Sequence, residues 1–478
     1  MLVITNARLL TMEKTDSPED ASEENAVSTS SGFSECFSRG VIEKGFIAVE
    51  ENRIVQIGPM DRIPPELLTD AADQTDKMSL ASELNQVLDA KGGWILPGFI
   101  DAHSHLGLFD DSLDFEGSDG NEDTDPITPQ LRAIDGIHNA DVCFREAYEA
   151  GVSIVMAGPG SGNVMGGQFA LLHTYERTVD RAVIQAPSAQ KVAFGENPKR
   201  VYGKDDKAPS TRMGTAGLLR DTLFKALEYR EKWDEYTHKK TEYDLAEARN
   251  DEDIPDSPDR PDFDFQLESL FPVLSGSIPL KIHAHRQDDI LTAVRICNEF
   301  GLKYTIEHCT EGHKIADVLY EEYSAGQVPG RGTGNKESKG GKLLGVIVGP
   351  IIGDRSKPEL SSLTTKTAGI LHRAGLPVAI MTDHPCVPQQ YLLLSTALAV
   401  KGGLPDSAAL SSITLTAAEI CGISDQYGSL TVGKKADLTL FSGDPYDYRS
   451  RVLLFVGAGV VRFDPEKMLE ESMERHLI

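Results

Sequence analysis

Residues 96–105 place two histidines at the end of an apolar run, in the order Leu-Pro-Gly-Phe-Ile-Asp-Ala-His-Ser-His. Side chains at positions i and i+2 of a strand point to the same face, so His103 and His105 can direct two imidazoles at one point. Imidazole pairs of this kind bind first-row metal ions. A lone His-x-His pair on a surface strand usually binds nothing, so the interpretation depends on the other histidines of the chain.

Several of the 12 histidines also follow apolar runs. Residues 278–285 end in His283 and His285, residues 303–308 end in His308, and residues 377–384 end in Asp383 and His384. If these runs are parallel strands of a barrel, their carboxyl ends lie on one face, where barrel enzymes carry their functional residues. We therefore expect one site that contains His103, His105, His283, His308 and Asp383.

Four imidazoles and a carboxylate indicate a hydrolytic metal site of the zinc type. Such an ion lowers the pKa of bound water to about 7 and polarises a carbonyl group, which makes hydroxide available at neutral pH. A carboxylate beside the ion can accept the proton of the water and donate it to a leaving nitrogen. Asp383 is the candidate for this general base and acid.

From residue 94 onward, short apolar runs alternate with helical stretches, which is the pattern of repeated βα units. This predicts an α/β protein with a (β/α)8 TIM barrel over residues 95–424 and a charged insertion at about 230–268. The eight candidate strands are 95–103, 153–158, 182–184, 191–195, 280–285, 303–308, 344–348 and 378–383. The candidate helices are 140–150, 213–229, 288–300, 314–323, 363–374 and 391–401.

Short strands are also expected near both chain ends, at residues 1–12, 41–60, 428–441 and 452–463. They can pair into one small β domain that the barrel interrupts, with an N-terminal part at 1–94 and a C-terminal part at 425–478. Two polar insertions, residues 13–39 and 61–90, divide the N-terminal part. The first is rich in Ser, Glu and Asp, so it is expected to be a flexible loop.

The composition limits the partners of the protein. Its apolar fraction of 40% and charged fraction of 25% are those of a soluble globular protein. A formal net charge of −27 argues against nucleic acid or an anionic membrane as partner, because phosphate binding needs clustered Lys and Arg. Six cysteines without Cys-x-x-Cys spacing, no signal peptide and no long apolar run favour a cytoplasmic location. We expect a small-molecule substrate, and the sequence is compatible with a homo-oligomer.

Together these motifs resemble the amidohydrolase superfamily. The resemblance rests on Pro97-Gly-Phe-Ile-Asp-Ala-His-Ser-His105, Ile282-His-Ala-His285, Glu307-His308, Thr382-Asp-His384 and the closing segment Gly-Ser-Leu-Thr-Val-Gly-Lys-Lys-Ala-Asp-Leu at 428–438. It covers nearly the whole chain apart from the insertions. Within the superfamily, the sequence is most similar to the branch of imidazolonepropionase, related cyclic-amide hydrolases and prolidase-like enzymes.

The resemblance implies a (β/α)8 barrel flanked by a split β-sandwich, and hydrolysis of C–N bonds other than those of ordinary peptide chains. It also implies one or two divalent metal ions, with Zn²⁺ as the expected ion. By motif, His103 and His105 hold the first ion, and His283 and His308 are the other histidine ligands. Asp383 binds metal and acts as the general base.

In members with two metal ions, one further side chain bridges the ions, and the resemblance does not settle which residue that is here. Binuclear members carry a carboxylated lysine or a glutamate from the third or fourth strand, and Lys191 and Glu196 are the two candidates here. We favour Glu196, because it ends its apolar run whereas Lys191 begins it. One position departs from the deaminase-type pattern, since Arg286 replaces the glutamate that protonates the ring. This departure argues against cytosine or guanine deamination.

Four residues are candidates for substrate binding. Arg286 can pair with a substrate carboxylate in a bidentate manner, although a structural salt bridge explains it equally well. His285 can contact substrate or support a ligand. Asn163 belongs to the glycine-rich segment 158–168, whose backbone can approach a ligand closely or simply form a tight turn. Arg212 follows the Glu196 segment and can reach the same face.

The leading hypothesis is a metal-dependent amidohydrolase, in which a metal-activated water opens a cyclic amide or cleaves a small amide. One alternative in the same class is a prolidase-like dipeptidase or N-acyl amino acid hydrolase. Another is a non-catalytic relative that binds a small metabolite.

Overall fold

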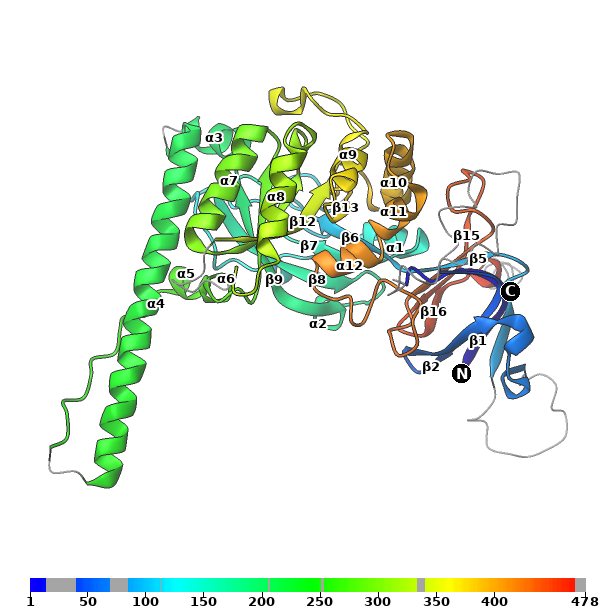
Figure 1. Ribbon diagram of the computed structural model, residues 1–478, viewed down its shortest axis with the longest axis horizontal. Helices are drawn as coiled ribbons and strands as arrows, with labels where there is room; N and C mark the ends of the chain where they lie inside the picture. The colour runs from blue at the N-terminus through cyan, green and yellow to red at the C-terminus, as the bar shows by residue number, and fades with distance from the viewer. Residues whose placement is uncertain are drawn as a thin grey trace.

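A computed structural model of the chain describes residues 1–13, 40–68, 85–111, 113–204, 207–250, 253–332 and 340–468. Within these ranges a central barrel carries most of the helices, and a second sheet lies to one side of it (Figure 1). Residues 14–39, expected as a flexible loop, lie outside the described residues, as do residues 69–84 of the second polar insertion.

Eight consecutive strands form the barrel sheet, and their order in the sheet follows their order in the chain. Seven of them run parallel, which places their carboxyl ends on one face. The strands are β6 (Phe99–Ser104), β7 (Val152–Ala157), β8 (Met165–His173), β9 (Val183–Ala193), β10 (Leu280–Ala284), β11 (Lys303–His308), β12 (Lys342–Val348) and β13 (Val378–Ile380). The domain is therefore TIM-barrel-like, as expected.

The third strand of the barrel differs from the prediction. β8 is antiparallel to both of its neighbours, and it replaces one repeat of the βα pattern with a hairpin-like excursion. The predicted strands 182–184 and 191–195 are the two ends of the single long strand β9. The polar residues and Pro187 inside β9 hid its continuity, and Gly166 and Gly167 at the start of β8 had the composition of a turn.

The first predicted barrel strand is also two strands. β5 (Trp94–Pro97) belongs to the other sheet, and β6 begins the barrel after Gly98. A Cβ at Gly98 would lie 2.4 Å from the Ser153 hydroxyl oxygen, so only glycine allows the chain to pass between the two sheets here.

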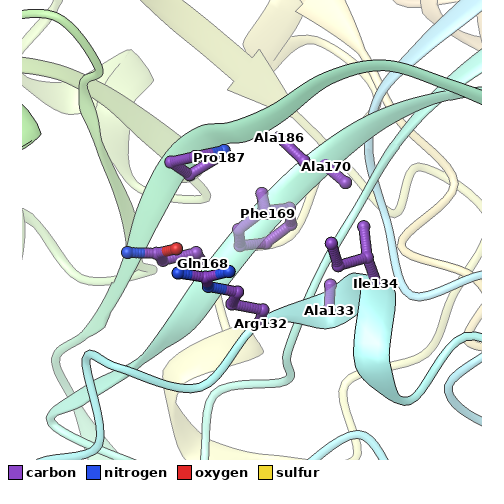
Figure 2. A pocket seen from close by; sticks show the side chains of 8 residues that line it. All are labelled: Arg132, Ala133, Ile134, Gln168, Phe169, Ala170, Ala186 and Pro187. Carbon is purple, nitrogen blue, oxygen red and sulfur yellow. The ribbon is translucent and has the colours of Figure 1, made fainter. Parts of the chain in front are cut away.

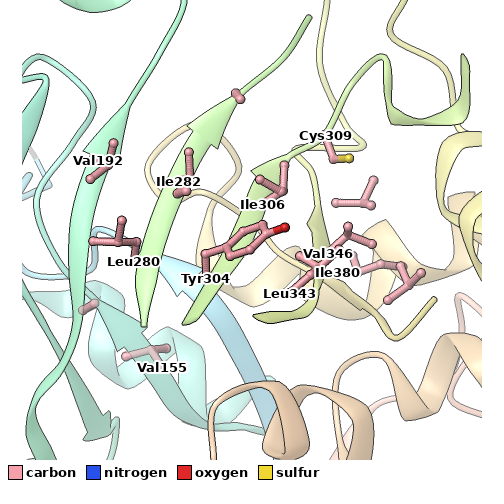
Figure 3. Packing of buried hydrophobic residues seen from close by; sticks show 14 of the residues in the cluster. Val155, Val192, Leu280, Ile282, Tyr304, Ile306, Cys309, Leu343, Val346 and Ile380 are labelled. Carbon is pink, nitrogen blue, oxygen red and sulfur yellow. The ribbon is translucent and has the colours of Figure 1, made fainter. Parts of the chain in front are cut away.

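Side chains of the barrel strands alternate between two environments. Leu280 and Ile282 of β10 and Tyr304 of β11 join the large apolar cluster that packs under the outer helices (Figure 3). The intervening Lys281 points the opposite way, because its Nζ donates to the Ala102 carbonyl oxygen of β6 at 2.8 Å across the barrel. The polar side chains of β9, β10 and β11 therefore face the barrel interior.

Twelve helices are present in the described ranges, and the longer ones cover the outside of the barrel (Figure 1). They are α1 (Val142–Glu149), α2 (Val179–Ala182), α3 (Glu196–Gly203), α4 (Arg212–Arg249), α5 (Phe265–Glu268), α6 (Phe271–Leu274), α7 (Gln287–Phe300), α8 (Ala316–Gly326), α9 (Thr367–Arg373), α10 (Leu392–Lys401), α11 (Asp406–Ser411) and α12 (Leu415–Ile420). None of the helices in the described ranges has the length and apolar character needed to cross a membrane.

Helix α4 extends well beyond the barrel, as Figure 1 shows in green. Its outer half has few packing partners, so charge pairs one turn apart support it, among them Lys239 with Glu235 and Lys240 with Asp244. Asn250 in the left-handed conformation ends the helix. Much of the charged segment 230–268 therefore extends helix α4, and the chain then continues without regular structure over residues 254–264.

Strands from both chain ends form the second sheet. Its order is β16-β15-β14-β5-β1-β2-β3, with β4 paired to β1, and one apolar cluster draws on strands from both ends. All eight strands belong to a single sheet. Besides β5, they are β1 (Leu2–Leu10), β2 (Val41–Glu50), β3 (Arg53–Pro59), β4 (Gln86–Asp89), β14 (Leu438–Phe441), β15 (Val452–Gly457) and β16 (Val460–Phe463).

Asp101 links the first and last strands of the barrel, and we call this junction the β6–β13 seam. Its Oδ2 accepts hydrogen bonds from the Thr382 backbone at 3.0 Å, the Thr382 hydroxyl at 2.6 Å and the Gln389 amide at 2.7 Å. Its Oδ1 accepts from the His103 backbone at 3.1 Å. Asp101 is completely buried, so these four donors supply the partners that water would otherwise provide.

Asp101→Asn is expected to lower the free energy of unfolding by roughly 1–3 kcal/mol, the usual cost of leaving buried donors unpaired. The amide has the same size as the carboxyl group, but its NH2 group is a donor. It would face groups that are themselves donors, so at least one of their hydrogen bonds would be lost. Urea denaturation of the metal-free protein measures this change, with Asp425→Asn as the exposed control. Equal unfolding midpoints for Asp101→Asn and the unmodified protein would contradict the proposed role of the seam.

Candidate metal centre

The barrel brings the predicted strand-end residues together in two groups. His103, His105 and Asp383 form one group, whose ligand atoms lie within 4.8 Å of one another. The other group meets the same criterion and contains His283, His308 and, in addition, His285. All six side chains are buried.

The first group surrounds one oxygen of Asp383. Its Oδ1 lies 3.2 Å from the His105 Nε2 and 3.5 Å from the His103 Nε2. Asp383 reaches this position because its backbone nitrogen donates to the His103 carbonyl oxygen at 3.3 Å across the β6–β13 seam. The residues that follow the last barrel strand therefore lie next to the end of the first strand.

The second group adjoins the first. The ring centroids of His283 and His308 are 4.3 Å apart, and those of His285 and His308 are 4.4 Å apart. His308 also lies 5.8 Å from the His103 ring, so the five imidazoles form one continuous cluster. Two ions side by side, or one ion with a second shell of imidazoles, can be held by such an arrangement.

Oxygen atoms close to Nδ1 orient three of the imidazoles. The Nδ1 atoms of His105 and His308 lie 2.6 and 2.9 Å from the carbonyl oxygens of Gly158 and Gly349. The His103 Nδ1 lies 2.8 Å from the Glu307 carboxylate. Because these partners are acceptors, each Nδ1 carries the proton and each Nε2 keeps a free lone pair, the state in which imidazole binds a metal ion.

Glu307 was missed as a site residue in the sequence analysis, although it directly precedes His308. The Lys281 Nζ donates to its Oε2 at 2.9 Å, and the Thr305 hydroxyl donates to its Oε1. Burial opposes ionisation, yet Lys281 and His103 hold the pKa of Glu307 at about 2. Glu307 is thus a permanent anion that fixes the orientation of His103.

Two residues of the centre have a strained backbone. His308 has a φ of 65° and Asp383 a φ of 56°, in the left-handed region that non-glycine residues seldom occupy. Strain of this kind persists where the surroundings determine the conformation, and it is common at functional sites. It directs both side chains from their strand ends towards the centre.

The electrostatic state of the centre suits metal binding. Burial lowers the pKa of His103, and burial together with the neighbouring histidines lowers the pKa of His283 and His308 well below 6.5. Burial alone would raise the pKa of Asp383, but His308, His103 and His105 hold it well below its ordinary value. At neutral pH the centre therefore offers neutral imidazoles and an ionised carboxylate.

Lys191 lies in the barrel interior with no hydrogen-bond partner for its Nζ among the described residues. Burial lowers the pKa of its amine to about 8, against the opposing charges of Asp383 and Glu307. Its charge also acts on His103 in the first group and on His283 and His285 in the second. Lys191 therefore lies close to both groups.

Glu196, which the sequence favoured over Lys191, joins neither group of ligand atoms. Gly195, with a φ of 90°, turns the chain after β9, so that Glu196 begins helix α3 instead of ending a strand. Its backbone nitrogen donates to the Oε2 of Glu359 at 3.0 Å. The other oxygen of Glu359 is buried without a hydrogen bond, 3.7 Å from the His285 Nε2 and 4.0 Å from the His283 Nε2.

The remaining substrate-binding candidates have other partners. Arg286 is exposed and pairs with Asp288 at 2.9 and 3.0 Å, and Arg212 pairs with Asp289 at 2.9 and 3.1 Å. The buried Asn163 amide donates to the Glu122 and Asp125 carbonyl oxygens at 2.7 and 2.8 Å, and so supports the loop after β6. Of the four candidates, only His285 lies in the centre.

A pocket of about 430 Å³ opens over the centre and exposes parts of His105, His283, His308 and Asp383. Another hollow of about 210 Å³ lies on β8 and β9 (Figure 2). Phe169 lines that hollow and packs its ring 5.3 Å from the His103 ring, so it separates the hollow from the centre. Of these two, only the pocket of about 430 Å³ is lined by residues of the ligand groups.

The metal-free protein is expected to lose stability as the pH falls from 6.5 towards about 4. Unfolded imidazoles bind protons below 6.5, whereas burial keeps the pKa of His285 at about 4 in the folded protein. The unfolded state therefore binds more protons in this window, so acidification favours it. The pKa is also lowered in five other histidines, so their protonation destabilises the folded state in the same way. They are His103, His173, His283, His308 and His384.

Some carboxyl groups act in the opposite direction, because burial raises the pKa of Asp101 and Asp437 to about 6 and also raises that of Glu149, Asp289, Asp406 and Asp444. Because the pKa shifts of the buried histidines are larger than those of most of these carboxyl groups, the urea midpoint should still fall over this window. A midpoint that stays constant or rises on acidification would contradict the assignment of neutral, buried imidazoles.

The chain resembles known proteins over nearly its whole length. A crystal structure of an amidohydrolase from Thermotoga maritima MSB8 is 32% identical, with a TM-score of 0.75, and the match covers 97% of this chain and 100% of that one. A prolidase crystallised with N-methylphosphonate-L-proline has a TM-score of 0.50 at 15% identity over 96% of this chain and 98% of that one, a likeness of fold alone.

Curated sequences agree with this result. The imidazolonepropionase of Maricaulis maris (strain MCS10) is 26% identical over 84% of this chain and 88% of its own length. The amidohydrolase tasK of Hapsidospora irregularis is 25% identical over 91% of this chain, which spans only 41% of the length of tasK. The sequence pattern of the Amidohydrolase family matches residues 283–468, which include the second ligand group and Asp383. The chain therefore belongs to the amidohydrolase family, whose members are metal-dependent hydrolases of carbon–nitrogen bonds.

Proposed function

We propose that this protein uses a metal-activated water to hydrolyse the C–N bond of a small cyclic amide or amide. The observation that carries the proposal is the pair of adjoining, buried ligand groups beneath one pocket. Family membership supports the reaction class, and the pocket volume of about 430 Å³ supports a small substrate.

The donor set fits a divalent ion, with Zn²⁺ as the proposed metal. Imidazole nitrogen and carboxylate oxygen are its usual ligands in catalytic sites, where three protein ligands leave a position open. His103, His105 and Asp383 would hold one ion, and His283 and His308 would hold another, with His285 beside them. A bound ion supplies a Lewis acid that makes water nucleophilic near neutral pH and polarises the amide carbonyl.

Asp383 would move the proton of the reaction. Its carboxylate is ionised at neutral pH and lies at the pocket floor, where it can accept a proton from the attacking water. The water oxygen bonds to the amide carbon, and the C–N bond breaks. The proton held by Asp383 passes to the leaving nitrogen, so the products are a carboxylate and an amine, which remain in one molecule when the amide is cyclic.

Lys191 is the better candidate for a group that bridges two ions. An amine with a pKa of about 8 is partly neutral near physiological pH and can react with CO₂ to give a carbamate and a proton. The carbamate would replace an unpaired buried cation with an anion between the two ligand groups. Because Glu196 joins neither group of ligand atoms, we place the bridging role on Lys191.

A prolidase-like dipeptidase or N-acyl amino acid hydrolase is the second candidate. Arg286, which the sequence suggested as a partner for a substrate carboxylate or as part of a structural salt bridge, is paired with Asp288. The pocket has room for an acyclic dipeptide as well as for a ring. Both candidates require the same metal centre and the same proton transfer.

Purified protein is expected to bind one or two equivalents of Zn²⁺ or Mn²⁺ per chain. In a screen of cyclic amides, imides and dipeptides, Asp383→Asn should lower turnover by about 10²-fold or more, because the variant cannot accept the proton. Asp425→Asn, an exposed change of the same kind, should behave like the unmodified protein. Protein that binds no metal, or an Asp383→Asn variant that keeps full turnover, would reject the proposal in favour of a non-catalytic relative.

A second experiment separates the two bridging candidates by metal stoichiometry. Lys191→Ala should reduce bound metal from two ions to one, and added acetate should restore the second ion by occupying the vacated space. Glu196→Gln should leave the stoichiometry unchanged. The reverse result, loss in Glu196→Gln with no effect of Lys191→Ala, would return the bridging role to Glu196.

A further inference from the structure

One wall of the pocket over the centre carries an unpaired cation. Lys357 is the one lysine or arginine among the described residues that line this pocket. It lies in the connection after β12, just before a single 3-10 turn at Pro358–Leu360. No carboxylate of the described residues lies within ion-pair distance of its Nζ.

A neutral amide holds Lys357 in place. Its Nζ donates to the Oδ1 of Asn197 at 3.1 Å, and the Asn197 Nδ2 donates to the Ser161 hydroxyl at 2.8 Å. Asn197 is buried, and its Nδ2 also lies 3.4 Å from the His283 Nε2. One amide side chain therefore separates the Lys357 ammonium from a nitrogen of the second ligand group.

The backbone beside Lys357 is fixed as well. Glu359, two residues later, accepts a hydrogen bond from the Glu196 backbone, the residue that precedes Asn197. The connection after β12 is thus attached to the start of helix α3 at two adjacent points. This double attachment keeps the Lys357 side chain, which is half-buried, directed along the pocket wall.

The two arginines that the sequence suggested for substrate binding are already paired. Arg286 is bound by Asp288 and Arg212 by Asp289, which satisfies both cations within the protein. The Asp354 carboxylate, which also lines the pocket, accepts from the Ser356 backbone nitrogen at 3.1 Å. Among the described residues that line the pocket, Lys357 is therefore the cation with donors to spare for a ligand.

Part of the remaining wall is apolar. Phe109, Ile352, Leu360 and Leu363 line the same pocket, and all four are only partly covered by the protein. A ligand in the pocket can therefore contact the metal ligands, the Lys357 ammonium and an apolar patch, among polar residues such as Thr310 and Asp354.

From this arrangement we propose that Lys357 binds a carboxylate of the substrate, which restricts the enzyme to amides that carry an anionic group close to the scissile bond. This inference rests on the proposed function, since it places the amide at the metal centre. It makes Lys357 a specificity residue, a role that the sequence analysis gave to Arg286. The substrate class is then a small amide, cyclic or acyclic, with a carboxylate and an apolar portion.

Two hydroxamates of similar size test the proposal by binding to the zinc-loaded protein. Succinic acid monohydroxamate has a metal-binding end and a carboxylate, and butyrohydroxamate has a methyl group in place of the carboxylate. Titration calorimetry should give a dissociation constant about 10-fold or more lower for the carboxylated probe, the range of a hydrogen bond between charged groups. Lys357→Gln should remove this preference and Lys357→Arg should retain it, while both leave butyrohydroxamate binding unchanged.

Lys366→Gln is the matched control, because it removes the same charge from an exposed position outside the pocket nine residues later in the sequence. It should keep the preference for the carboxylated probe. Equal affinities for the two hydroxamates in the unmodified protein, or a preference that persists in Lys357→Gln, would overturn the role of Lys357 while leaving the metal centre intact. Failure of both probes to bind, with no metal taken up, would instead reject the proposed function and this inference with it.

Matched substrates then separate cyclic from acyclic amides. Hydantoin-5-acetate and 5-methylhydantoin differ by the carboxylate in the cyclic class, and N-acetyl-L-leucine and N-(3-methylbutyl)acetamide differ in the same way in the acyclic class. The carboxylated member of the class that the enzyme hydrolyses should have the lower KM, and Lys357→Gln should raise that KM more than it lowers kcat. Equal KM values within a hydrolysed pair would contradict the proposal.

Discussion

Asp101 accepts four hydrogen bonds at the β6–β13 seam, and the position of the whole centre depends on them. β6 and β13 are the ends of the sheet order, and they carry His103 and Asp383 towards each other only if the sheet curves into a barrel. The same carboxylate holds the His103 backbone and the Thr382 backbone and hydroxyl. A single buried anion therefore sets the spacing between His103 and Asp383, the proposed general base, because its two oxygens bind both partners at once.

Burial then determines the charge of each group in the centre. The barrel interior contains two lysines, and only one of them is neutralised, since Lys281 pairs with Glu307 while the Lys191 Nζ lacks a partner among the described residues. An unpaired buried ammonium costs free energy and gives up its proton more readily than an exposed one. A packed apolar side chain would fill this position at lower cost. This cost favours a chemical role for the amine, which is why we propose Lys191 as the bridging group.

The sequence predicted those parts of the centre that depend on local pattern. His103 and His105, His283 and His308 end strands, and strand ends of a barrel converge, so their grouping needed no knowledge of the loops. The antiparallel β8 could not be predicted in this way, because its glycines resembled a turn and its direction is set by pairing with distant strands. Glu196 does not end its strand as expected, because a single residue, Gly195, turns the chain after β9 and Glu196 begins helix α3. Glu359 and Lys357 were missed because they reach the centre from a loop that packs on helix α3.

In the proposed function, chemistry and recognition are carried by different parts of the fold. The strand ends position the candidate metal ligands, whereas the connection after β12 supplies Lys357 and part of the apolar wall. A net charge of −27 gives the molecule a field that repels anions at long range, so steering cannot favour an anionic substrate. A carboxylate must then be selected by direct contact. At contact distance its attraction to a half-buried ammonium is stronger than its repulsion by distant surface charges, which salt screens. Lys357 satisfies this requirement, because it lies beside the metal ligands and is held there by Asn197 without being neutralised.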